Sequence, residues 1–162
     1  MVDDGTVWAE REFDGHDFRD EDLSRLRTHR VVFTDCDFSG VDLSESEHEG
    51  SAFRNCTFRR TVLLHSMFRH CSFLGSVFTE CRMRPVTFVE VDFTLTVLGG
   101  SDLRGIDLSG ARVQNTKLEE ADLRGARVDP TLWTTAALRG AKVDIEQAMA
   151  FAAAHGLDIH GA

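Results

Sequence analysis

The sequence lacks long apolar runs. None of its 162 residues falls in a stretch that approaches the ~18 consecutive apolar residues of a membrane-spanning helix. Residues 1–4 also lack the basic start and following apolar run of a secretory signal. We therefore expect a cytoplasmic protein without a membrane partner.

Motifs of catalytic chemistry are missing as well. The sequence has no glycine-rich phosphate loop, no nucleophile elbow and no zinc-binding helix pattern. Paired acids such as Glu119 and Glu120 are common on solvated surfaces and do not indicate a site. The sequence predicts a protein that is not an enzyme, with no catalytic residue and no cofactor. A hydrolase or transferase would require an outward pocket with convergent polar groups.

Basic residues are scarce. The chain has 18 Lys and Arg against 27 Asp and Glu, a net charge of −9, which disfavours direct nucleic-acid binding and favours a basic protein partner. Residues 10–49 hold thirteen acids and five bases. Residues 51–79 hold no acid and four arginines, Arg54, Arg59, Arg60 and Arg69. The expected surface is acidic, then basic, then mildly acidic.

An apolar residue recurs at every fifth position. From Phe13 to Val128 this register has 24 positions, and only Thr28 and His48 are not apolar. A composition of 42% apolar residues would give about ten by chance, so the period is significant. A second column, two residues earlier, runs from Val31 to Ala126 and holds only small or β-branched residues.

A period of five fits neither an α-helix nor a flat strand, so the chain must turn after every five residues. Four turns close a square coil of twenty residues, and coils stack at the ~4.8 Å strand spacing through their backbone amides. The sequence therefore predicts an all-β, right-handed quadrilateral β-helix over residues 1–128. Local irregularity is expected at Thr28 and His48, which break the apolar column, and at Pro85, because proline removes an amide donor.

The corners of the coil have the expected chemistry. Nine of the thirteen glycines, from Gly15 to Gly140, fall two residues after a central position, and Asn55 and Asn115 occupy the same slot. Glycine and asparagine tolerate the positive φ that tight corners require.

The four cysteines have no zinc-like spacing. They lie at Cys36, Cys56, Cys71 and Cys81, without the close Cys-x-x-Cys pair of zinc sites. All four fall in the inward column of small residues, where cysteine acts as a compact hydrophobe. A structural role is therefore favoured over a disulfide, and no metal site is expected.

Residues 129–162 form a separate C-terminal segment. Asp129-Pro130 predicts a helix start with Asp129 as the cap, and Leu138 to Val143 keep the repeat register. Asp144 and Gln147 form a capping-box pattern for a helix that ends at Gly156. This helix either covers the open end of the rod or joins two subunits, and the apolar tail after it favours a homodimer. The expected interface residues are Trp133, Leu138, Ile145, Met149, Phe151, Leu157 and Ile159.

The repeat, written as small-x-(Leu/Phe)-x-x, resembles the pentapeptide-repeat superfamily, which Ala121-Asp122-Leu123-Arg124-Gly125 matches residue by residue. Other segments resemble the mycobacterial fluoroquinolone-resistance pentapeptide proteins (MfpA type): DFRDEDLSRL (17–26), SAFRNCTF (51–58), VDFTL (91–95), VLGG (97–100) and AFAAAHGL (150–157). The resemblance implies a cytosolic homodimer joined through its C-terminal segments. It implies a rod with the width and negative charge of B-form DNA that binds DNA gyrase in place of duplex DNA, modulates it and protects it from quinolones. The four arginines of residues 51–79 have no counterpart on DNA.

Acids on the outside of the rod are then the expected partner-binding surface. They are Asp35, Asp37, Asp42, Glu45, Glu47, Glu49, Asp92, Asp102, Asp107 and Asp122. The alternative is a general protein-interaction scaffold with a partner other than gyrase. In that case neutralising these acids would leave activity intact, and altering an apolar or arginine-rich patch would remove it.

Overall fold

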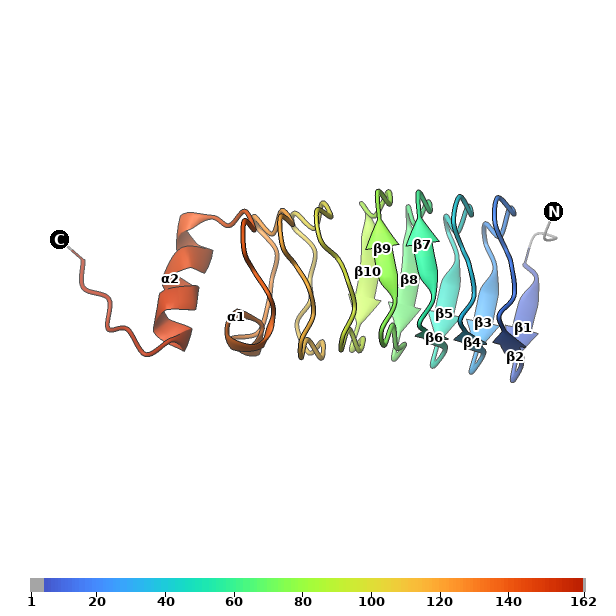
Figure 1. Ribbon diagram of the computed structural model, residues 1–162, viewed down its shortest axis with the longest axis horizontal. Helices are drawn as coiled ribbons and strands as arrows, with labels where there is room; N and C mark the ends of the chain where they lie inside the picture. Colours follow the sequence, from blue (N-terminus) through green and yellow to red (C-terminus); the bar gives the residue numbers. More distant parts are fainter. Residues whose placement is uncertain (1–4, 162) are drawn as a thin grey trace.

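The computed structural model describes residues 5–161; residues 1–4, on which the absence of a secretory signal was argued, and residue 162 lie outside the described residues. The chain winds into an elongated rod with its N-terminus at one end and a helix and tail at the other (Figure 1). Among the described residues, no helix is long and apolar enough to span a membrane.

Strands stack in parallel with an offset of twenty residues, as in the pairs Val7 with Arg27 and Arg27 with Glu47. The first face of the rod holds β1 (Val7–Ala9), β3 (Arg27–His29), β5 (Glu47–Glu49), β8 (Ser66–Arg69) and β10 (Val86–Val89). The second face holds β2 (Glu12–Asp14), β4 (Val32–Thr34) and β6 (Ala52–Arg54), and the third holds β7 (Thr57–Arg59) and β9 (Val77–Thr79). The fourth face has single bridges, such as Asp22 with Asp42. The predicted β-solenoid of twenty-residue coils is confirmed.

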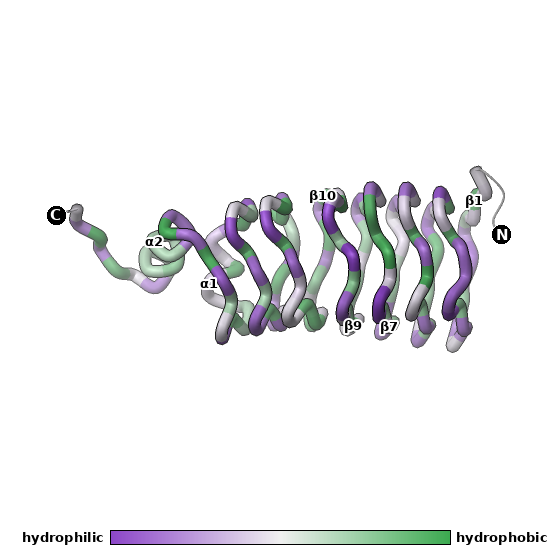
Figure 2. Tube along the Cα trace, turned by 90° about the horizontal axis from the view of Figure 1, so that it is seen from above, coloured by the Kyte–Doolittle hydropathy of each residue, from purple (hydrophilic) through white to green (hydrophobic). Residues whose placement is uncertain are grey.

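The central residues fill the rod and stack on their counterparts one coil away. The ring centroids of Phe38 and Phe58 are 5.0 Å apart with 5° between the planes, and those of Phe58 and Phe78 are 4.5 Å apart with 3°. The second column is also buried, and its hydroxyls bond to the backbone, as where Ser76 Oγ donates to Phe53 O at 2.7 Å. Polar and apolar residues alternate along each coil as a result (Figure 2).

Corner residues of many types adopt positive φ, not only glycine and asparagine. Every fifth residue from Gly5 to Gly125 has positive φ except Pro85, and these residues include acids, arginines and Leu95 at φ 58°. An L residue in this conformation is strained. The strain is offset because most corner amides bond to the next coil, as where Arg60 N donates to Thr79 O at 2.9 Å.

No irregularity occurs at Thr28 or His48, so that prediction was wrong. The ladder is continuous, with Thr28 paired to His48 and His48 to Phe68. Both side chains are buried and bonded: His48 Nδ1 lies 2.7 Å from Thr28 Oγ1, and His48 Nε2 lies 3.0 Å from Ser46 Oγ. The imidazole also stacks on Phe68 at 4.6 Å and 10°. Polar residues fit the core column here because their hydrogen bonds are satisfied and the ring replaces a phenylalanine.

The interruption at Pro85 is confirmed and extends over two faces. No bridge joins Arg82 to Asp102 on the fourth face or Thr87 to Asp107 on the first, although all of these residues are described. On the second face, Asp92 bridges Arg112 without a break. We call this opening between residues 82–90 and 102–110 the seam. It lies between β10 and the coil that follows (Figure 1).

The C-terminal segment closes the end of the rod. Helix α1 (Thr131–Thr135) has no side-chain cap, and the carboxylate of Asp129 instead accepts from Gly110 N at 2.7 Å, so the predicted Asp129 cap was wrong. Gly110 offers an amide free at the rod surface, which competes with the helix for that carboxylate. Helix α2 (Ile145–Ala154) begins at the predicted Asp144–Gln147 capping box. Buried Gln147 donates Nε2 to Leu123 O at 2.6 Å, which ties α2 across the last coil.

The buried imidazole predicts a pH-dependent stability. Burial lowers the pKa of His48 to about 3 from 6.5. Between these values the unfolded chain binds a proton there that the folded chain does not, so stability falls as pH falls below 6.5. From pH 7.5 to pH 5 the loss is about 2 kcal/mol.

We expect His48→Phe, which continues the ring stack, to abolish this loss in urea unfolding at the two pH values. The exposed-histidine variant His29→Gln should keep it. An equal pH dependence in the wild type and His48→Phe would contradict the assignment.

Candidate binding surfaces

The expected acids do not converge on one patch. Asp35, Asp37, Asp42, Glu45, Glu47 and Glu49 lie in one coil, which we call the acidic coil, and the twenty-residue winding spreads them over all sides of the rod. Only Glu47 and Glu49 share a strand, β5. The acidic coil is therefore a band around the rod.

Carboxylates of the acidic coil are weakly paired. Asp42 accepts from Ser44 N and Ser44 Oγ at 2.8 and 2.6 Å, which holds it at the surface without a cation. Glu45 and Glu47 lie 3.4 and 3.9 Å from arginine nitrogens of the preceding coil. Asp37 accepts from Ser39 N and lies 3.8 Å from Arg19 Nε, whereas Asp35 and Glu49 have no ion pair among the described residues. Exposed pairs of this kind contribute little and leave the charge open to a partner.

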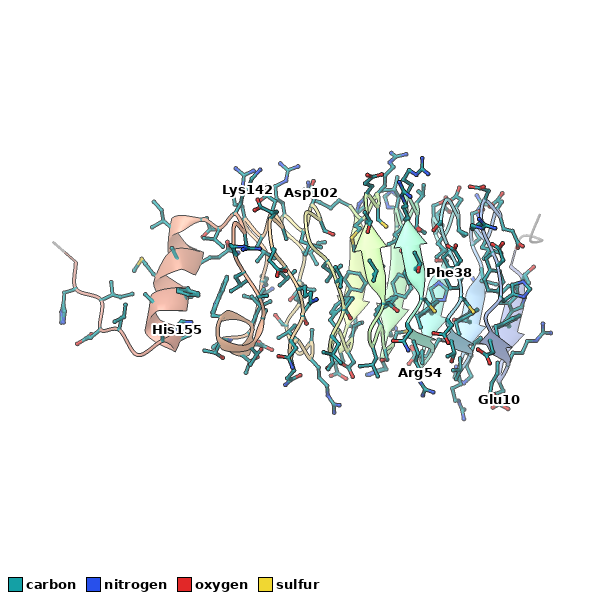
Figure 3. The ribbon with its side chains drawn as sticks, in the orientation of Figure 1. Glu10, Phe38, Arg54, Asp102, Lys142 and His155 are labelled. Atoms are coloured by element: carbon teal, nitrogen blue, oxygen red, sulfur yellow. The ribbon has the colours of Figure 1, made fainter. Side chains whose placement is uncertain are left out.

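Asp102 and Asp122 differ from the expected phosphate-like array. Both lie on the fourth face as bridge partners, and Asp102 in Figure 3 lies at the rod surface among cationic side chains. Arg104 Nη2 lies 2.8 Å from Asp102 Oδ2, Arg84 Nη1 lies 3.3 Å from the same oxygen, and Arg124 Nη2 lies 2.7 Å from Asp122 Oδ2. The hydrogen bond from Arg124 lowers the pKa of Asp122 to about 2, and that from Arg104 lowers the pKa of Asp102. Both carboxylates are thus paired with arginine and do not present free negative charge to a partner.

The local signal for this pairing is Asp-x-Arg around a central residue. Two residues that flank a central position both point outward on one face, so Asp17 meets Arg19 as Asp102 meets Arg104. Asp107 is also paired within the chain, since it accepts from Ser109 N at 2.9 Å and lies 3.7 Å from Arg127 Nη1. Asp92 accepts from Thr94 N at 2.9 Å and, like Asp42, has no cation beside it among the described residues.

The arginines of residues 51–79 form a cationic belt next to the acidic coil. Arg54, Arg59 and Arg60 make no ion pair within residues 5–161, and Arg69 Nε bonds to Met67 Sδ at 3.0 Å. Arg54 points outward from the rod in Figure 3. The distribution of charge along the sequence predicted this belt. The structure shows that the guanidinium groups of Arg54, Arg59 and Arg60 are not paired with a carboxylate within residues 5–161.

An apolar face lies at the C-terminal end. The exposed fractions are 81% for Ile145, 49% for Met149, 64% for Leu157 and 42% for Ile159. Phe151, 42% exposed, contacts the indole of Trp133 edge-on with centroids 6.3 Å apart. Two residues expected on this face lie elsewhere: Trp133 is buried in the core, where it continues the central column, and Leu138 is half-buried against it.

The profile of the family described as Pentapeptide repeats matches residues 49–84 and 87–125 in eight copies. The chain is a pentapeptide-repeat protein. The resemblance inferred from the repeat pattern is thereby confirmed.

Two curated relatives carry the name pentapeptide repeat protein MfpA. The protein of Mycolicibacterium smegmatis is 79% identical over 63 residues, which are 39% of this chain and 33% of the relative. The protein of Mycobacterium tuberculosis is 58% identical over 99 residues, which are 61% of this chain and 54% of the relative. The matched region thus spans between a third and about half of the length of these relatives. A solved structure of trypsin-treated QnrB1, described as a plasmid-mediated fluoroquinolone resistance protein, covers 96% of this chain and 98% of its own, with 21% identity and a TM-score of 0.44.

The pentapeptide-repeat protein has an outward cavity of about 620 Å³ at the seam. Its charged lining residues are Arg84, Arg104 and Asp107. All three are paired within the chain. Arg84 pairs with Asp102, Arg104 pairs with both Asp102 and Asp122, and Asp107 pairs with Arg127. Among the described residues that line it, the only hydroxyl side chain is that of Thr87.

The cysteines of this pentapeptide-repeat protein are core residues. All four are free thiols, and Cys36, Cys56 and Cys71 are buried. Their sulfurs donate to the backbone of the preceding coil, as where Cys56 Sγ donates to Phe33 O at 3.4 Å. Within residues 5–161 no group of three or more His, Cys, Asp or Glu is placed to hold a metal ion.

Burial makes these thiols poorly reactive. It raises the pKa of Cys56 and of Cys71 to about 12. Because the thiolate is the reactive species, we expect native protein at pH 8 to react with a disulfide reagent more than about a hundredfold more slowly than urea-unfolded protein. Stopped-flow absorbance measures both rates. Rapid reaction of two or more thiols in the native state would contradict the packing.

Proposed function

We propose that this protein binds DNA gyrase in place of duplex DNA, inhibits or modulates its supercoiling and protects it from fluoroquinolones. The resemblance to the mycobacterial fluoroquinolone-resistance pentapeptide proteins and the identity to MfpA direct the proposal to this partner. The observation that carries it is the charge density of the first two coils.

Residues 10–49, two coils, have a net charge of −8. Two coils rise about 10 Å, and B-form DNA carries about six charges over that length. Residues 50–129, by contrast, have a net charge of +2. The part of the rod proposed to replace DNA is therefore its N-terminal third, and the carboxylates at Asp102 and Asp122 do not contribute.

A gyrase supercoiling assay tests the proposal, run with rising protein and at several salt concentrations. The wild type should inhibit supercoiling at low salt, and this inhibition should weaken steeply as the salt concentration rises. We expect Asp35→Asn, Glu47→Gln and Glu49→Gln together to weaken inhibition at least about tenfold, because they remove open charges that steer association.

The matched control is Glu80→Gln, Glu119→Gln and Glu120→Gln, which removes the same charge elsewhere and should change inhibition less than about twofold. Absence of binding, inhibition and drug protection at low salt would reject the proposal. Full activity in the first triple variant, with loss on changing Arg54, Arg59 and Arg60, would favour a scaffold that binds an acidic partner through the cationic belt.

We further propose that two subunits join through the apolar face of α2 and the tail. Five side chains support this interface: Ile145, Met149, Phe151, Leu157 and Ile159, all exposed in the single chain. Exposed apolar patches of this kind mark protein interfaces. A cytoplasmic location is part of the proposal, and free, closely packed thiols agree with a reducing compartment.

Light scattering tests the dimer. Ile145→Asp with Met149→Asp should yield a monomer at concentrations at which the wild type is dimeric, because the charges would be buried without partners. Leu95→Asp, an equally drastic change at a 53% exposed leucine on the rod, should leave the dimer intact. A dimer that survives the double change would place the interface elsewhere.

A further inference from the structure

The seam exposes two unpaired strand edges. On both sides of the seam central amides donate to the next coil, as Leu63 N does to Arg82 O at 2.8 Å and Leu103 N to Asp122 O at 2.9 Å. Across the seam the corresponding amides of Met83 and Phe88 make no such bond.

The opposite lip of the seam has the same feature. The amides of Asp102 and Asp107 do not reach back to the preceding coil, although Asp92 N bonds to Cys71 O at 2.9 Å on the neighbouring face. Both lips of the seam thus hold main-chain groups without a backbone partner, and residues 84–88 and 104–107 of these lips line the cavity. Main-chain groups in this arrangement recognise an extended polypeptide.

The floor of the cavity is apolar. Val86, Phe88 and Ile106 line it with exposed fractions of 9%, 6% and 5%. Pro85 and Gly105 form the corner of each lip and add no long side chain. The volume of about 620 Å³ lies within the range of sites that hold a peptide-sized or smaller ligand.

Cations predominate on the fourth face beside the cavity. Arg84, Arg104 and Arg124 share the carboxylates of Asp102 and Asp122, and Arg82 makes no ion pair within the described part of the chain. Four arginines thus face two carboxylates, an excess of two positive charges at the rim. An acidic ligand complements this rim.

We propose that the seam is a binding groove for an extended acidic segment of a partner protein. The segment's main chain pairs with the free amides and carbonyls of the lips, its small apolar side chains face Phe88 and Ile106, and its carboxylates meet Arg82 and Arg84. This site is distinct from the acidic coil, and it acts through directional hydrogen bonds.

The probe for a test is an octapeptide of alternating glutamate and valine, titrated into uniformly ¹⁵N-labelled full-length protein. Bound peptide should shift the amide signals of Met83, Phe88, Asp102 and Asp107 and slow their hydrogen exchange. A lysine–valine octapeptide and a backbone N-methylated glutamate–valine octapeptide should each bind at least tenfold more weakly. Equal affinity of the N-methylated peptide would reject main-chain pairing.

Two charge variants with intact cores complete the test. Arg82→Gln with Arg84→Gln should weaken peptide binding at least tenfold, and the matched pair Arg59→Gln with Arg60→Gln on the cationic belt should change it less than twofold. Equal losses in both pairs, shifts confined to the belt, or no binding at all would overturn the proposal. Because the readout uses no gyrase, its outcome is independent of the supercoiling assay.

Discussion

The parallel backbone pairing at an offset of twenty residues is the constraint on which the rest of the molecule depends. It fixes which side chains stack in the core, and it also places outward residues in columns one strand spacing apart. Like charges fall on each other in this way at Asp17 and Asp37, and at Asp102 and Asp122. At ~4.8 Å two such charges repel by about 1 kcal/mol in water, a cost that the backbone ladder imposes. Arg19 and Arg104 each lie between two stacked carboxylates and offset it.

The same constraint separates structural charge from available charge. An acid with an Asp-x-Arg partner has its carboxylate occupied, as at Asp122. An acid whose flanking residue is serine, as at Asp42, has no cation to compensate its charge, because the serine supplies only a neutral donor. The number of acids per coil therefore overstates the unpaired negative charge in the second half of the rod. It describes the first half well, where Asp35 and Glu49 have no cation.

Much of the fold follows from the five-residue period, because each central position faces inward whatever its neighbours are. The capping box of α2 follows from Asp144 and Gln147 alone, since both bonds are local. Contacts between coils were harder to predict. The five-residue period does not predict that the His48 imidazole bonds to two hydroxyls. Nor does it predict that the Asp129 carboxylate accepts from Gly110 N instead of capping its own helix. Trp133 was assigned to the dimer interface because it lies in the segment after Val128, whereas its side chain is buried in the core. The candidate site was predicted as a set of outward acids, and their pairing needed the positions of the arginines.

The extent of the seam could not be predicted from the sequence, although its cause, Pro85, could. Pro85 removes one amide, and the chain loses the bridges on two faces while Asp92 and Arg112 keep theirs on a third. One missing donor at a corner therefore frees both adjoining edges, because the corner positions the two strands that meet there. The acidic coil lies two coils away, about 10 Å at the strand spacing, which exceeds the ~8 Å screening length at physiological salt. Charge at one surface is thus largely screened from the other. The rod is able to engage a cationic partner at its N-terminal coils and an acidic segment at the seam without either occupant opposing the other.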